Sequence, residues 1–272
     1  MESRSALRKR LGCRPGGRTL EDGLDWASRE GFHNLEFCAD YGADGLTEWP
    51  GARADAVRAA CRERDLHLTI HTLSGVNVAE FSPFLSEAVD AYLAANIDLA
   101  ARLDANVIVH AGLHFSHQLD LRRQASMEHL LRAVAHAERR KVDLLLENLN
   151  FEPDDAEVHY LGHSIEELRG YFDAIDSSRL RWAFVPNHAH LLPEDFDAFL
   201  DAFGVDRIGM VLVADCRGTV EEHLLPGEGN LDFGRLFRRL DEAGYRGPFI
   251  LTFGDREQKI SGREAVLDRA GA

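Results

Sequence analysis

The sequence predicts an α/β fold, a single (β/α)8 barrel that spans residues 1–272 as one domain. Short apolar runs alternate with amphipathic stretches along the whole chain, which is typical of repeated βα units. Eight such runs can be counted, and 272 residues is an ordinary length for one barrel. A doubly wound sheet would also alternate, but Gly12, Gly16 and Gly17 do not form its Gly-rich first turn.

The predicted strands are the apolar runs themselves. In chain order they are Lys9–Cys13, Asn34–Cys38, Leu66–His71, Asn106–His110, Val142–Asn148, Leu180–Val185, Ile208–Val213 and Pro248–Thr252. The fifth run is apolar almost throughout and ends in a carboxylate and an amide, which indicates a strand buried on both faces.

Capping signals place several of the helices between these strands. Thr19 can cap a helix that begins after the first strand, and a Ser-Pro pair at Ser82 begins a long helix that ends near Leu103. The remaining helices are expected over Ala54–Arg64, over Leu119–Arg140 and from a capping box at Ser164–Glu167.

Composition and charge exclude several classes of protein. Hydrophobic residues make up 45% of the chain, yet no apolar run approaches the roughly 20 residues that span a bilayer. Residues Met1–Ser5 lack the apolar core of a signal peptide, and the four cysteines have no paired spacing, so we expect a cytoplasmic protein with free thiols. The net charge of −15 argues against nucleic acid as a binding partner. It favours a neutral or cationic small molecule as the substrate, unless the charge serves solubility alone.

Polar side chains gather at the ends of the predicted strands, where the loops of a barrel meet at one mouth. They are His71, His110, Glu147, Asn148, Asn187, His188, Arg217, Glu221, His223 and Glu228. One strand-end histidine is more often structural than functional, but several beside a carboxylate form a different pattern. Imidazole and carboxylate groups bind zinc, manganese or iron, and they also carry acid–base chemistry near neutral pH.

Four segments give the sequence a family resemblance. They are Val109–Gly112, Leu146–Asn148, Asn187–His190 and the run His223–Phe233, which is similar to a His-x-x-x-Gly-Glu-Gly-Asn-hydrophobic-Asp motif. Through them the chain resembles the xylose isomerase-like TIM barrel superfamily, which holds sugar isomerases and epimerases, inosose dehydratases and zinc-dependent apurinic endonucleases. In the motif, Gly227 and Gly229 would permit a tight backbone path beside the pocket, and Glu228 could orient its neighbours.

The resemblance also shows departures in the metal site. Isomerase-type members hold one divalent metal through four ligands, of which Glu147 is kept while the others fall on Val185, Leu212 and Thr252. The usual isomerase metal is therefore expected to be absent, and no cofactor is favoured. The apolar replacements are also expected to dry the pocket and raise the pKa of a nearby carboxylic acid.

Endonuclease-type members use further ligands, and the resemblance maps these onto two groups. One is His71, His110 and Glu147, and the other is His188, Glu221 and His223. The sequence therefore leaves open two relocated sites for zinc, manganese or iron.

These residues predict an isomerase, epimerase or dehydratase that moves protons on a small polyhydroxylated or carbonyl substrate. The expected catalytic residues are Glu147, His188 and His223. Substrate binding is expected from His71, His110, Asn148, Asn187, Arg217 and Glu228. The alternatives are a non-catalytic barrel that binds a small molecule and, against the charge, a metal-dependent phosphodiesterase acting on abasic DNA. The oligomeric state is open, a homodimer being one alternative.

Overall fold

Eight parallel strands close into a barrel, in the order β1-β10-β9-β8-β6-β4-β3-β2. The structure is a computed structural model that describes residues 3–115 and 117–271. The barrel strands are β1 (Leu11–Cys13), β2 (Asn34–Phe37), β3 (His67–His71), β4 (Asn106–Val109), β6 (Leu144–Glu147), β8 (Leu180–Phe184), β9 (Ile208–Val213) and β10 (Phe249–Leu251).

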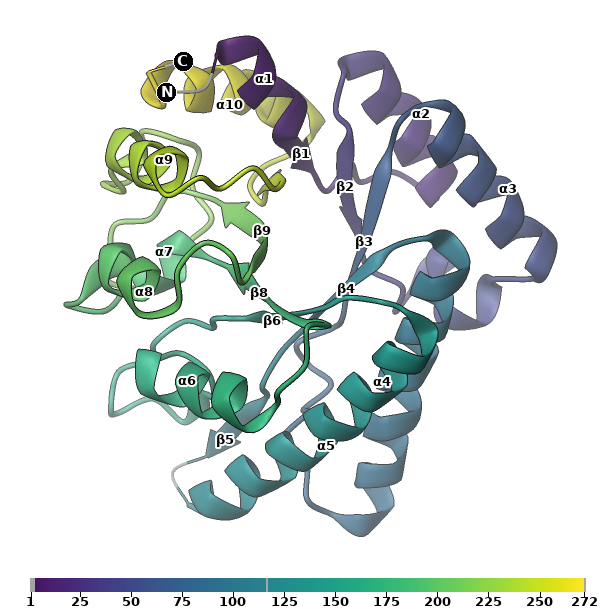
Figure 1. Ribbon diagram of the computed structural model, residues 1–272, viewed down its shortest axis with the longest axis vertical. Coiled ribbons are helices and arrows are strands. Elements are labelled where there is room, and N and C mark those ends of the chain that lie inside the picture. Colours follow the sequence, from purple (N-terminus) through teal and green to yellow (C-terminus); the bar gives the residue numbers. More distant parts are fainter. Residues whose placement is uncertain (1–2, 116, 272) are drawn as a thin grey trace.

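Helices surround this barrel and connect its strands (Figure 1). They are α1 (Arg4–Arg10), α2 (Leu20–Glu30), α3 (Gly51–Glu63), α4 (Pro83–Leu103), α5 (Leu119–Arg140), α6 (Ile165–Ala174), α7 (Pro186–Ala189), α8 (Asp195–Phe203), α9 (Phe233–Glu242) and α10 (Arg256–Arg269), with short 3-10 turns η1 (Gly42–Asp44) and η2 (Leu46–Glu48). The predicted (β/α)8 barrel is confirmed. Within the described ranges, no helix combines the length and apolar character needed to cross a membrane.

Alternation along β6 decides where its carboxylate points. Leu144 and Leu146 pack into the outer core between the strands and the helices, whereas Leu145 belongs to a separate apolar cluster inside the barrel. Because successive side chains of a strand face opposite sides, Glu147 faces the barrel interior, as Leu145 does. The strand therefore delivers a buried carboxylate to the C-terminal mouth of the barrel.

Some element boundaries differ from the sequence predictions. Lys9 and Arg10 were predicted to begin the first strand but belong to α1, which Ser3 caps by accepting a hydrogen bond from the backbone N–H of Ala6. The third helix begins at Gly51 rather than Ala54. At α6 only half of the capping box forms, because the Glu167 carboxylate accepts from the backbone N–H of Gly162 instead of from that of Ser164.

A two-stranded antiparallel sheet, formed by β5 (Leu113–Phe115) and β7 (Val158–Tyr160), was not predicted. Its strands lie in the connections that follow β4 and β6, so the sheet stands at the mouth of the barrel. Tyr160 from β7 lines the cavity described next.

Candidate functional site

A cavity of about 610 Å³ opens at the C-terminal ends of the barrel strands. Six of the residues that line it are the histidines and carboxylates of two compact groups. They are His71, His110, Glu147, His188, Glu221 and His223. The structure thus brings the predicted catalytic residues together with two of the predicted substrate-binding histidines.

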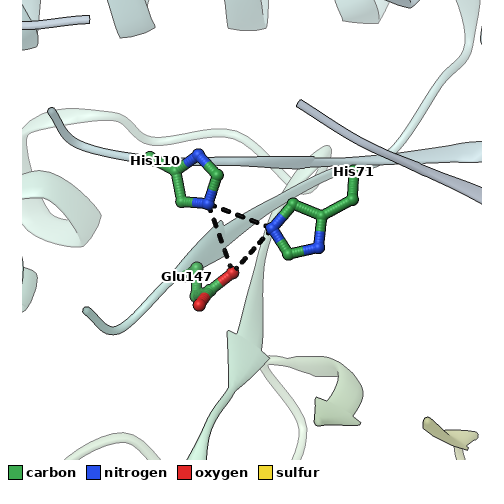
Figure 2. A group of neighbouring side chains, drawn as sticks. All are labelled: His71, His110 and Glu147. Atoms are coloured by element: carbon green, nitrogen blue, oxygen red, sulfur yellow. Dashed lines mark hydrogen bonds and ion pairs between the residues drawn. The ribbon is translucent and has the colours of Figure 1, made fainter. Parts of the chain in front are cut away.

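The first group consists of His71, His110 and Glu147, from the ends of the neighbouring strands β3, β4 and β6 (Figure 2). Glu147 Oε2 lies 3.2 Å from His71 Nε2 and 3.5 Å from His110 Nε2, and the two Nε2 atoms are 3.0 Å apart. Glu147 and His110 are buried. Three potential ligand atoms therefore converge on one point at the floor of the cavity.

A fully buried carboxylate stands behind this group. Glu36, from β2, accepts a hydrogen bond from His71 Nδ1 at 3.0 Å and another from Arg14 Nε at 3.0 Å. Burial alone would raise the pKa of Glu36, but His71 and Arg14 hold it at about 2. The bond to Glu36 fixes the His71 ring so that its Nε2 faces Glu147.

The charges of the first group are set by these contacts. Burial lowers the pKa of His71, but the carboxylates of Glu36 and Glu147 outweigh it and raise that pKa to about 9. Burial also acts to raise the pKa of Glu147, yet the facing imidazoles of His110 and His71 hold it well below its ordinary value. The prediction that a dry pocket raises the pKa of this carboxyl is therefore wrong, because the nearest groups are histidines.

The second group consists of His188, from α7, with Glu221 and His223, from the loop after β9. His188 Nδ1 donates to the backbone carbonyl of Asn148 at 2.9 Å, which leaves Nε2 to face Glu221 Oε1 at 3.7 Å. His223 Nε2 lies 2.6 Å from the same oxygen. His188 Nδ1 is also 3.7 Å from Glu147 Oε1, so the two groups adjoin.

The donor atoms of both groups fit a divalent cation. In each group the three atoms lie within 4.8 Å of one another. Glu147 Oε2 and His188 Nε2 are buried without a hydrogen-bond partner, as expected of atoms that await a ligand. His71 and His188 use Nδ1 for a carboxylate and a carbonyl, the arrangement that commonly supports metal-bound imidazole.

Comparison with known proteins decides the family. Residues 24–270 match the family described as xylose isomerase-like TIM barrel. The chain belongs to the xylose isomerase-like TIM barrel family. No curated protein matches it by sequence.

Solved structures of this barrel fold are similar over almost the whole chain. A D-tagatose 3-epimerase-like protein has 21% identity and a TM-score of 0.85, covering 96% of this chain and 97% of its own. A D-psicose 3-epimerase from Clostridium cellulolyticum H10, solved with D-tagatose, has 15% identity and a TM-score of 0.76, covering 95% and 97%. A 3-keto-D-glucoside 4-epimerase from E. coli has 17% identity and a TM-score of 0.77, covering 97% and 100%.

The replacement of three isomerase metal ligands stays a prediction of the sequence. Val185, Leu212 and Thr252, the three replaced positions, all line the cavity. Val185 and Leu212 also belong to the apolar cluster inside the barrel, together with Leu145. Neither side chain offers an atom that coordinates a metal, and Thr252 instead contacts His223 Nδ1 at 3.1 Å.

Four predicted substrate-binding residues lie outside the cavity lining. Asn148 faces away from the barrel interior, because it follows the inward-facing Glu147. Its side-chain amide donates to the backbone carbonyl of Val185 and accepts from the backbone N–H of Val185. Asn187 donates to the carbonyl of Glu222, exposed Arg217 pairs with the Glu222 carboxylate, and Glu228 accepts from the N–H of Leu225. Substrate binding by these four residues remains a prediction that their placement does not favour.

Asp215 is a structural residue of the site that was not among the predicted site residues. Its buried carboxylate accepts hydrogen bonds from the backbone N–H groups of Gly227 and Gly229, at 2.7 and 3.0 Å, and from that of Leu231 at 3.1 Å. It therefore fixes the loop that carries Glu221 and His223. The available signal was its position directly after the seventh strand.

Two cavity cations were also missed. Arg14 directly follows β1, so its position at a strand end could have indicated it. Lys259 lies inside α10, away from any strand end, so that signal was absent.

Proposed function

We propose that this protein is an isomerase-type enzyme that moves a proton on a small polyhydroxylated carbonyl compound, with Glu147 as the group that takes and returns the proton. The observation that carries the proposal is the state of Glu147. Its Oε2 is buried at the cavity floor, where it makes no hydrogen bond but lies 3.2 and 3.5 Å from the Nε2 atoms of His71 and His110, and its pKa lies well below the ordinary value. At neutral pH it is a carboxylate in position to act as a base.

His71 supplies the complementary charge. With a pKa raised to about 9, it is an imidazolium at neutral pH, 3.2 Å from Glu147. When Glu147 removes a proton from the carbon beside a carbonyl, negative charge develops on the carbonyl oxygen. A cationic donor stabilises that charge, and return of the proton to either face or to the neighbouring carbon completes an epimerisation or isomerisation.

The second group offers places for hydroxyl groups of the substrate. His188 Nε2 has no hydrogen-bond partner, and His223 lies beside it with ring centroids 6.1 Å apart. Burial lowers the pKa of His223, but Glu221 outweighs this effect and raises it, so this ring also favours the protonated form. We infer that His188 Nε2 contacts a substrate oxygen, while Glu221 and Thr252 hold His223 in place beside it.

A divalent cation in the first group would take the place of the His71 imidazolium, because His71 binds a metal only as a neutral imidazole. His71, His110 and Glu147 would hold one ion and His188, Glu221 and His223 another, and such an ion polarises a carbonyl oxygen as a Lewis acid. The sugar epimerase names of the similar structures support a sugar-like substrate, as part of the proposal.

The test is conversion of a panel of ketoses and oxidised sugars, followed by product analysis. The Glu147→Gln variant is expected to stay folded and to lose roughly 10²-fold or more of the turnover, since loss of a general base slows proton transfer by that much. Glu63→Gln, an exposed change at the end of α3, is the matched control. Ligands that raise the melting temperature of the wild type without being converted would instead support a non-catalytic binding barrel.

A phosphodiesterase is a second candidate because both metal-compatible groups are intact. The net charge of −15 opposes binding of a phosphate backbone. Cleavage of an abasic oligonucleotide by zinc- or manganese-loaded protein, lost in Glu147→Ala, would favour this candidate over the isomerase.

A further inference from the structure

Two cations line the cavity described above. Arg14 directly follows β1, and Lys259 lies near the start of α10, which follows β10. Strands β1 and β10 are neighbours, and β6 is the fourth strand from β1 in either direction around the closed barrel. Arg14 and Lys259 therefore form a cationic wall on the β1 and β10 side of the cavity, from which Arg14 reaches to Glu36 and His71.

Lys259 is a buried ammonium without a counter-charge. Lys259 is 7% exposed, and its Nζ donates a hydrogen bond to the backbone carbonyl of Gly254. In residues 3–115 and 117–271, no carboxylate forms a salt bridge with it. An ammonium has three donors, so two remain for another partner, and a buried charge without a partner is costly.

Arg14 differs from Lys259 because its charge is already matched. Nε and one terminal nitrogen of Arg14 contact Glu36 Oε1, while the side chain is 48% exposed toward the cavity mouth. The uncompensated positive charge of the wall is therefore that of Lys259, and Arg14 adds further N–H donors beside it.

We propose that Lys259, assisted by Arg14, binds an anionic group of the substrate, a carboxylate or a phosphate. The inference rests on the proposed function and names its substrate class, which is an acidic sugar derivative rather than a neutral sugar. The overall charge of −15 favoured a neutral or cationic molecule at the level of the sequence. The cavity differs locally from that average, because Lys259 brings to it a positive charge that no carboxylate pairs with.

The position of Lys259 orients the ligand. Glu147, Glu221 and Glu152 line other parts of the cavity and repel an anionic group from them. The anionic end is then held at Lys259, and the neutral carbonyl end reaches Glu147. A cavity of about 610 Å³ has room for such a molecule.

The lysine composition of the chain makes a direct test practical. The sequence contains three lysines, and Lys9 and Lys141 are exposed. Protein labelled with ¹³C at lysine Cε, stripped of metal and dialysed, is titrated with inorganic phosphate and separately with acetate. The Lys259 signal is assigned by its loss in Lys259→Arg.

We expect a saturable shift of the Lys259 signal with one or both anions, while the Lys9 and Lys141 signals stay unchanged. A response to phosphate alone identifies a phosphorylated substrate, and a response to acetate alone identifies a carboxylated one. No saturable shift, or equal shifts of all three lysines, overturns the inference. Only the assignment of the signal uses a variant, and the titration itself is done on the wild-type chain.

Substrate kinetics give the second arm. Lys259→Met is expected to raise KM for acidic ketose derivatives by roughly tenfold or more, since it removes hydrogen bonds to a charged group, and to raise it far more for them than for neutral ketoses. Lys259→Arg should restore most of the affinity. The inference is overturned if the wild type converts neutral ketoses at least as well as acidic ones and Lys259→Met changes neither activity. The proposed function would then remain intact. A saturable, anion-dependent shift of the Lys259 signal in a protein that converts no ketose would support the anion site and refute the proposed function.

Discussion

At the scale of residues, the site depends on a chain of alternating charges. Arg14, Glu36, His71 and Glu147 follow one another across four barrel strands, each within hydrogen-bond or ion-pair distance of the next. The two carboxylates are buried, so their charges persist because the histidine and the arginine compensate them. His71 lies at the centre of this series of contacts because it pairs with both carboxylates, Glu36 and Glu147.

The raised pKa of His71 predicts how the stability of metal-free protein depends on pH. A group whose folded pKa is raised stabilises the fold fully below its unfolded pKa, here 6.5, and loses that contribution as the pH rises through about 9. We therefore expect the free energy of unfolding, measured with urea, to fall between pH 6.5 and pH 9. The fall should be smaller in His71→Gln and unchanged in the exposed control His67→Gln. Equal slopes in all three proteins would contradict this role.

At the scale of elements, the loop after β9 is the least regular part of the site and the most closely held. Asp215 receives three backbone N–H groups from it, and Gly227 adopts a positive φ of 101°. Gly229 passes so close to the end of β9 that an added Cβ would lie 2.2 Å from the carbonyl oxygen of Cys216. The glycines of this loop are therefore needed for its path, not for flexibility.

Gly229→Ala should displace the loop and with it Glu221 and His223. We expect a loss of stability of about 1–3 kcal/mol, the usual cost of overpacking, together with reduced turnover. Gly170→Ala is the matched control, because a Cβ there meets nothing within 4 Å and the residue lies in α6. Thermal unfolding of the two variants measures the difference, and equal stability of both would refute the account of the loop.

The elements also show what the sequence could predict. Strand β9 and helix α5 have the predicted bounds, because each carries a long run of the expected periodicity. The sheet of β5 and β7 was missed because strands of three residues are too short to show alternation. The two groups of histidines and carboxylates were predicted from strand ends, whereas Lys259 depends on how α10 packs back over the mouth.

At the scale of the whole molecule, the two groups of donor side chains predict that a bound cation would stabilise the fold. Neighbouring donors of the first group are at least 37 residues apart in the sequence, and in the second group His188 lies 33 residues before Glu221, so only folding assembles either group. A cation that binds the folded state alone stabilises it by an amount that grows with concentration.

We expect added zinc or manganese to raise the melting temperature of chelator-treated, dialysed protein. At 100 times Kd the gain is about 2.7 kcal/mol for one site. His110→Gln should reduce the gain from the first group and His223→Gln that from the second, with the double variant losing both. Elemental analysis of protein purified without added metal is the companion measurement. A melting temperature that neither metal nor these variants alter would show that the groups work without a cation.

The central claim is that Glu147 transfers a proton to and from substrate carbon, and solvent deuterium tests it most directly. Wild-type protein incubated in D₂O with a panel of neutral and acidic ketoses should place deuterium on the carbon beside the carbonyl of its substrate. Glu147→Gln should abolish that uptake while the protein stays folded. Conversion without deuterium at this carbon, or uptake by Glu147→Gln as fast as by the wild type, would contradict the claim.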